Sequence, residues 1–461
     1  MVERSTLIGG WLVAHGAAPR SVVASLMNHT SDYICVQIGT GMSGAAFFPL
    51  ETHFGEGMLA MLLADMPPVA AVAGAGHVAR LRKALVEGGM PSPSPPTKPT
   101  PPPAAPPLLN LGAAALPASH RPPSSGSRWD VPRAMLRLKL GFSHETLAGV
   151  HEQRVEARAP QRVGVPLLDL SSPRWLRVAA AAAERAPPRA KWARADDMDP
   201  GMITMTSGTS GRPKGVCTPT RTLKISFVAR DRVLPYSGGA EADSDPEVEG
   251  ANVMYSWEAV RPLYFGQTVA VIPDDVITDT TALVPFLARH RVTRLLTTPS
   301  LLATLLDTTE IEMEAQLAEG GAAALTAAAA AASPHGALGS ALPTVRAWTL
   351  CGEVVPASIQ RRLGKLFPTL SLYNSYSSWE GSDATYAALS LHPPPSARVA
   401  PAGQLLPGVR CAVLDPSTGE VCGRAPFTEV RLGGLNSWTA RALLGRSCHT
   451  ASSESSSRAR L

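Results

Sequence analysis

Hydroxyl side chains, glycines and one lysine gather in the stretch MTSGTSGRPKGV, residues 205–216. Backbone N–H groups beside glycine can approach phosphate oxygens closely, and a lysine adds a compact positive charge. The stretch is not a Walker A loop, because Arg212 and Pro213 separate Gly211 from Lys214. A linker would also be rich in glycine and serine, but an apolar run, MITM, leads directly into this stretch. We therefore predict a phosphate-binding loop made by Thr206, Ser207, Gly208, Thr209, Ser210, Gly211 and Lys214.

The segment TSGTSGRPKG at 206–215 resembles the phosphate-binding signature of the acyl-adenylate-forming superfamily. This superfamily comprises AMP-dependent synthetases and ligases, including adenylation domains like those of nonribosomal peptide synthetases. Further segments resemble motifs of that family, in the same order along the chain. They are SGAAFFPLE (43–51), MYSWEAVRPLYFGQTVAVIPDD (254–275), TRLLTTPSLLATLL (293–306), LCGEVV (350–355), LYNSYSSWEG (372–381) and the segment 403–434.

The resemblance implies an α/β fold. It predicts the large N-terminal domain of the adenylate-forming fold, in which stacked, mostly parallel sheets are flanked by helices and joined by a smaller β-rich part. The two parts of this domain would be residues 1–87 and 134–434. Between them, proline is too dense at 88–133 for helix or sheet, so we predict a disordered insertion there. An alanine-rich insertion at 318–339 is expected to be mainly a loop, and the Ser/Arg-rich tail 435–461 to be disordered.

Apolar runs alternate between strand and helix patterns in the two predicted parts of the domain, which is typical of βαβ units and a mostly parallel sheet. We expect strands within 163–170, 202–208, 268–275 and 345–355, a strand leading into a helix within 292–302, and a helix at 356–367.

The same resemblance implies a reaction and its cofactors. ATP and Mg²⁺ would activate a carboxylic acid to an acyl-adenylate with release of pyrophosphate, and a thiol of phosphopantetheine or CoA would then accept the acyl group. A carrier-protein domain would be the partner. Lys214 and Glu380 take the catalytic positions, with Glu380 as the Mg²⁺ ligand. Gly352 and Glu353 would lie near the adenine, with Tyr376 beside its ring. Taken alone, Glu380 also fits an exposed loop carboxylate, and Tyr376 a packing residue.

The acid pocket inferred from the family contains one carboxylate. Amino-acid-activating relatives place an aspartate four residues before the pocket tryptophan, where this chain has Val253 before Trp257. Asp383 could instead hold a displaced cationic group, and with Trp257 it would favour a methylated ammonium, as in a betaine-like acid. The alternative is that Asp383 points to water. The predicted pocket residues are Val253, Met254, Trp257, Thr297, Thr349, Cys351, Ser375, Asp383 and Ala384.

Composition excludes several other classes of protein. The chain has 461 residues and a formal net charge of +5, without the dense basic run expected of a nucleic-acid arm. No apolar stretch is long enough to predict a membrane span. The six cysteines form no C-x-x-C pair, which argues against a zinc site and favours a reducing, cytoplasmic location.

After Gly434 the sequence shows neither the T-G-D motif that binds ribose in the family nor a late catalytic lysine. We therefore keep two hypotheses of different class. The chain is either an ATP-dependent acid-activating ligase or a catalytically impaired remnant that binds nucleotide or acid.

Overall fold

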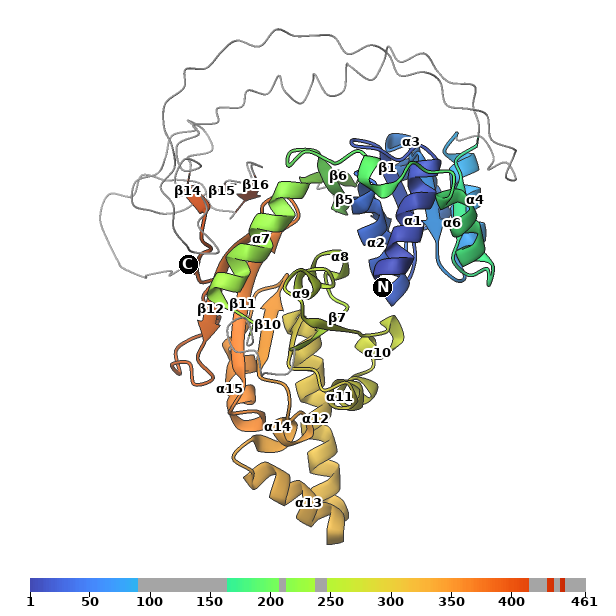
Figure 1. The fold of residues 1–461 in the computed structure, drawn as a ribbon. Coiled ribbons are helices and arrows are strands. Elements are labelled where there is room, and N and C mark those ends of the chain that lie inside the picture. The colour runs from blue at the N-terminus through green and yellow to red at the C-terminus, as the bar shows by residue number, and fades with distance from the viewer. Residues whose placement is uncertain (90–163, 207–212, 237–246, 414–428, 435–439, 444–461) are drawn as a thin grey trace, which may run out of the picture. The chain divides into compact units, whose positions relative to one another are not determined.

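A computed structural model describes residues 1–89, 164–206, 213–236, 247–413, 429–434 and 440–443 (Figure 1). Nearly all of the predicted proline-rich insertion lies outside these ranges, as does the tip of the predicted phosphate loop. Four residues of the predicted tail do form a strand, β16 (Ala440–Leu443). It pairs with β15 (Glu429–Gly434), which pairs in turn with β14 (Val409–Val413), and both pairings are antiparallel.

The first sheet has six strands in the order β4-β3-β1-β2-β5-β6. Its pairings are parallel except the last, in which β6 runs antiparallel to β5. The strands are β1 (Val22–Leu26), β2 (Ala46–Leu50), β3 (Ala70–Ala73), β4 (Leu167–Asp169), β5 (Pro200–Thr206) and β6 (Lys214–Pro219).

Helices cover both faces of this sheet, and its central strands accordingly consist mainly of apolar residues. Every residue of β1 is buried. Val23 packs with residues of α1, α2 and α6, whereas Val22 and Ala24 pack with residues of α3 and α4. These helices are α1 (Val2–Ala14), α2 (Ser31–Met42), α3 (Glu56–Asp65), α4 (Val78–Glu87) and α6 (Trp175–Ala183), and a short 3₁₀ helix lies at Arg189–Lys191.

The second sheet has seven strands in the order β13-β12-β11-β10-β9-β7-β8. Its strands pair in parallel from β8 to β11, and β12 and β13 then add antiparallel. They are β7 (Val248–Ala251), β8 (Thr268–Val271), β9 (Arg294–Thr297), β10 (Ala347–Cys351), β11 (Ser371–Ser378), β12 (Ser382–Leu389) and β13 (Gln404–Leu405).

A second core joins this sheet to the helices beside it (Figure 1). Trp348 of β10 is fully buried there, and its indole N–H donates to the Thr297 hydroxyl over 2.8 Å. The helices of this half are α7 (Thr220–Val233), α8 (Tyr255–Glu258), α9 (Arg261–Tyr264), α10 (Asp274–Thr278), α11 (Thr280–Arg289), α12 (Pro299–Glu319), α13 (Gly321–Ala332), α14 (Gly336–Ala341) and α15 (Ala357–Leu366).

The expectation of a mainly loop-like insertion at 318–339 is wrong. Helix α12 extends to Glu319, α13 follows after Gly320, and α14 begins at Gly336. Alanine has the highest intrinsic helix propensity, and this preference prevails in the repeated alanines of α13. The chain reverses at Gly320, whose φ of +72° is readily adopted by glycine.

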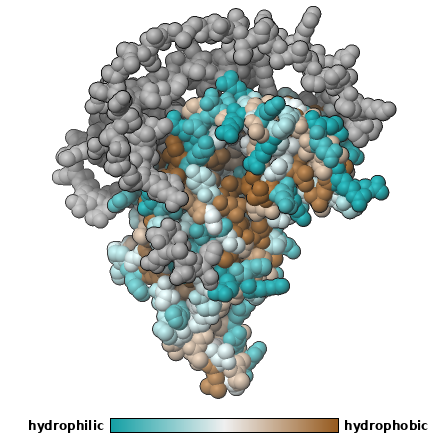
Figure 2. Space-filling view, in the orientation of Figure 1, coloured by the Kyte–Doolittle hydropathy of each residue, from teal (hydrophilic) through white to brown (hydrophobic). Residues whose placement is uncertain are grey.

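Among the described residues, no helix is both long and apolar enough to cross a bilayer. On the face of the molecule in Figure 2, hydrophilic residues are interspersed with hydrophobic ones.

Candidate functional site

The predicted phosphate loop connects the two strands of a hairpin. Thr206 ends β5 and lies opposite Lys214, the first residue of β6. The Lys214 side chain is exposed. Ser207, Gly208, Thr209, Ser210 and Gly211 lie outside the described residues. The hairpin thus places the first and last members of the predicted loop side by side, at the base of the connection between the strands.

The residues expected near adenine and Mg²⁺ follow the ends of β10 and β11. Gly352 comes directly after β10 with a φ of +90°. Tyr376 near the end of β11 is 39% exposed, and Glu380 is exposed in the turn between β11 and β12. An exposed carboxylate fits Mg²⁺, because this ion usually keeps water and phosphate oxygens as its other ligands. In the described part of the chain, no three His, Cys, Asp or Glu residues cluster as a metal site.

Glu353 contacts a residue that is distant in the sequence, and no sequence pattern predicted this contact. Its carboxylate accepts the Ser300 backbone N–H over 3.1 Å and the Ser300 hydroxyl over 2.8 Å. Ser300 lies in the first turn of α12, where backbone N–H groups lack partners within the helix. Glu353 therefore stabilises the start of α12 in this structure.

Several predicted pocket residues meet at the ends of three neighbouring strands. Cys351 of β10 lies beside Ser375 of β11, and both are buried. On β12, Asp383 lies opposite Ser377 of β11, and the buried Ala384 follows Asp383 in the sequence. The Thr349 hydroxyl is hydrogen-bonded to the Tyr386 hydroxyl over 2.8 Å. Trp257 of α8 approaches the turn after β11, where its ring centroid lies 6.2 Å from that of Trp379.

Asp383 does not point to open water. Its side chain is 7% exposed, and it accepts a hydrogen bond of 2.6 Å from the Ser226 hydroxyl of α7. The guanidinium of Arg230, one helical turn further along α7, lies 3.7 Å from the same carboxylate oxygen. The carboxylate proposed for a substrate cation therefore already has a cation beside it.

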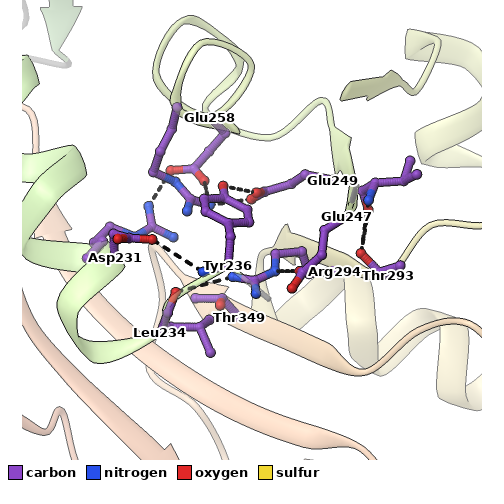
Figure 3. Close-up of polar contacts among 12 residues, drawn as sticks. Asp231, Leu234, Tyr236, Glu247, Glu249, Glu258, Thr293, Arg294 and Thr349 are labelled. Carbon is purple, nitrogen blue, oxygen red and sulfur yellow. Dashed lines mark hydrogen bonds and ion pairs between the residues drawn. The ribbon is translucent and has the colours of Figure 1, made fainter. Parts of the chain in front are cut away.

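Arg230 belongs to a buried charge network that sequence patterns did not predict (Figure 3). Arg230 also pairs with Glu258 of α8. Glu258 in turn accepts a hydrogen bond of 3.1 Å from the guanidinium of Arg261 of α9. Arg261 reaches Glu249 of β7 as well. The network continues through residues labelled in Figure 3. The Tyr236 hydroxyl donates to Glu249, and the guanidinium of Arg294 donates to Glu247.

Burial and ion pairing give two acids of this network different pKa shifts. Burial raises the pKa of the Glu249 carboxyl, and Arg261 offsets that effect only in part. Burial acts in the same direction on Glu258, but Arg230 and Arg261 outweigh it and lower its pKa. Of the two acids, Glu249 therefore takes up a proton more readily than Glu258 does.

A cavity of about 370 Å³ lies beside the predicted pocket. Val253 and Met254 line this cavity, whereas Trp257, Thr349 and Asp383 do not. Its other described lining residues are Met27, His29, Tyr33, Pro49, Leu50, Glu51, Thr52, His53, Asn252, Tyr255, Ser256, Asp274 and Trp379.

Asp274 connects two parts of the cavity wall. Its Oδ1 accepts a hydrogen bond from the Asn252 amide over 2.9 Å and lies 2.7 Å from His29 Nδ1. Its Oδ2 accepts the His29 backbone N–H over 3.2 Å. The carboxylate thereby joins the segment after β1 to the start of α10, two segments that no local sequence pattern relates.

A model of the family described as AMP-binding enzyme matches residues 1–434. This chain belongs to the AMP-binding enzyme family. The match spans both sheets and includes the hairpin of β5 and β6 with the predicted phosphate loop, the ends of β10 and β11, and the cavity. It confirms the family that the ordered sequence motifs predicted.

Two relatives of this AMP-binding family member illustrate its similarities. Over 241 residues, half of the chain, it is 30% identical to the glycine betaine reductase ATRR of Emericella nidulans, and the match covers 16% of that protein. Over 245 residues, 51% of the chain, it is 27% identical to an L-proline--[L-prolyl-carrier protein] ligase of Streptomyces coelicolor, and the match covers 40% of that ligase. The matches thus span less than half the length of either relative.

Solved structures agree with the fold. ATP-bound MatB from Rhodopseudomonas palustris has a TM-score of 0.58 at 15% identity, covering 95% of this chain and 65% of MatB. VinN has a TM-score of 0.59 at 16% identity, covering 95% of this chain and 82% of VinN. These similarities confirm the predicted α/β class, with mostly parallel sheets flanked by helices.

Proposed function

We propose that this AMP-binding family member activates a carboxylic acid, an amino acid or a betaine-like acid, to its acyl-adenylate. The observation that carries the proposal is the phosphate hairpin, in which Thr206 and the exposed Lys214 flank the glycine-rich connection. The similarity to a glycine betaine reductase and to a prolyl-carrier-protein ligase supports this class of acid.

The proposed reaction assigns a role to each exposed site residue. Bound ATP would supply the electrophilic α-phosphorus, and Mg²⁺ would shield the negative charge of the phosphates. Lys214 would neutralise charge on the β- and γ-phosphates, and Glu380 would provide a carboxylate oxygen to the metal. Tyr376 offers its ring to the adenine. A carboxylate oxygen of the acid bonds to the α-phosphorus, the bond to the β-phosphate oxygen breaks, and pyrophosphate leaves.

The acyl group then passes to a thiol. The sulfur bonds to the acyl carbon, AMP leaves, and the thiol proton passes to solvent. Phosphopantetheine on a carrier-protein domain and CoA are the two acceptors we propose, and the prolyl-carrier-protein ligase supports the first. The alternative function is binding of nucleotide and acid with impaired turnover.

ATP–pyrophosphate exchange across a panel of amino acids and betaines tests the proposal, together with a direct measurement of ATP binding. Exchange above the acid-free background with at least one acid is the expected result. ATP binding without exchange for any acid would favour the impaired alternative. If the chain bound neither ATP nor any acid, both functions would be wrong.

A further inference from the structure

The predicted pocket has no unpaired carboxylate for a substrate cation. Asp383 accepts the Ser226 hydroxyl over 2.6 Å and lies 3.7 Å from Arg230. A substrate ammonium placed at Asp383 would therefore meet the like charge of a buried guanidinium. If the acid carries a cationic group, that group needs another place.

The cavity beside the pocket has the chemistry of a cation site. Two carboxylates, Glu51 and Asp274, line it together with His29 and His53, and its described lining includes no lysine or arginine. Three aromatic side chains, Tyr33, Tyr255 and Trp379, also form its wall, and aromatic faces attract ammonium groups. Its volume of about 370 Å³ lies within the range of small-molecule pockets.

The same cavity adjoins the residues assigned to the reaction. Met254 lines it and has a left-handed backbone, with a φ of +52°, which is uncommon for a residue with a side chain. Its terminal methyl lies 3.9 Å from the position that a Cβ on Gly352 would take. Trp379, on another part of the wall, directly precedes Glu380. Met254 thus forms part of the cavity wall and also lies close to Gly352, one of the residues expected near the adenine.

We propose that this acidic and aromatic cavity, and not Asp383, binds the cationic group of the acid substrate. Its role as part of the substrate site rests on the function proposed above. The ligand class is a carboxylic acid with an ammonium or methylated ammonium group. Glu51 supplies the opposite charge, whereas Asp274 already contacts Asn252 and His29, and Trp379 supplies an aromatic face.

Choline and its neutral isostere 3,3-dimethylbutan-1-ol test the site directly, because neither can be adenylated. We expect calorimetry on the full chain to show tighter binding of choline than of the isostere. Glu51→Gln and Trp379→Leu should each weaken choline binding about three- to tenfold and leave the isostere unaffected. Asp275→Asn is the matched control, since Asp275 is the exposed neighbour of Asp274 and does not line the cavity.

Exchange assays with glycine betaine then relate the cavity to catalysis. We expect the two cavity variants to raise the KM for betaine by the same factor by which they weaken choline binding, with little change in kcat. A choline preference that the variants remove, without exchange for any acid, would support the cation site and contradict the proposed function. Exchange with an unchanged KM for betaine in the two variants would support the proposed function and contradict the cation site. Equal binding of choline and its isostere, or choline binding lost only in Asp383→Asn, would overturn the cation site.

Discussion

The guanidinium of Arg230 and the carboxylate of Asp383 lie 3.7 Å apart in the interior, with side chains 4% and 7% exposed. Arg230 also pairs with Glu258, so this single cation stabilises two buried acids from different elements. Burial alone would favour loss of the arginine charge, but Glu258 and Asp383 outweigh it and raise the pKa of Arg230 far above its ordinary value. The contact therefore holds α7 against β12, with Arg230 in its charged form.

Replacing Arg230 should destabilise the fold far more than replacing its partner. Arg230→Met leaves Glu258 and Asp383 as buried acids with fewer compensating charges, and we expect a loss of about 3–5 kcal/mol in the free energy of unfolding. Asp383→Asn should cost less, because Arg230 keeps Glu258. Urea unfolding followed by circular dichroism measures both. The exposed Arg4, which pairs with Asp32, provides a control, and Arg4→Gln should cost less than about 1 kcal/mol. Equal losses for Arg230→Met and Arg4→Gln would contradict this account.

Replacing Lys214 should impair nucleotide binding without affecting stability. The side chain is exposed at the base of the predicted loop, so Lys214→Gln removes a charge but little packing. We expect ATP affinity to fall roughly tenfold, since a charged contact to phosphate is lost. Fluorescence titration with ATP measures the affinity, and thermal unfolding should be unchanged. Lys191→Gln, at another exposed lysine, should bind ATP like the parent. Unchanged affinity in Lys214→Gln would refute the phosphate site.

A side chain at Gly403 should not be tolerated. This glycine has a φ of +103°, and a Cβ there would lie 2.3 Å from the backbone carbonyl carbon of Tyr386. We expect Gly403→Ala to lower the free energy of unfolding by more than about 1 kcal/mol, through strain and a shifted β12. Gly57→Ala in α3 is the control, because nothing lies within 4 Å of its Cβ and alanine favours a helix. Denaturant midpoints compare the two, and similar midpoints would argue against so close an approach of Gly403 to β12.

Alkaline pH should destabilise the fold partly through a buried thiol. Burial raises the pKa of Cys217 to about 11 from its ordinary value of 9.0. The unfolded chain therefore releases this proton first, and the folded state loses stability as pH rises from 9 through 11, by at most about 3 kcal/mol. Cys217→Ser should show a shallower loss of melting temperature between pH 8 and 11. Identical pH slopes would show that the thiol does not contribute.

Local sequence patterns correctly predicted helices and strands whose intrinsic propensity agrees with the way they pack in the fold. The strand expected within 345–355 is β10, and the helix expected at 356–367 is α15. The patterns did not predict β12, whose sequence SDATYAAL shows no clear alternation and whose partners are β11 and β13. Its strand character depends on neighbours that are supplied by the fold, because β propensity mainly reflects packing against other strands.

The sequence by itself indicated the family and the position of the predicted phosphate loop, because those signals lie in short contiguous motifs in a fixed order. Only the tertiary structure decided the electrostatics of the substrate region. Ser226 and Asp383 are 157 residues apart, and His29 and Asp274 are 245 residues apart, yet each pair is in direct contact. Whether a carboxylate is paired with an arginine or lines a cavity depends on which distant segments pack around it, and no local spacing encodes that arrangement.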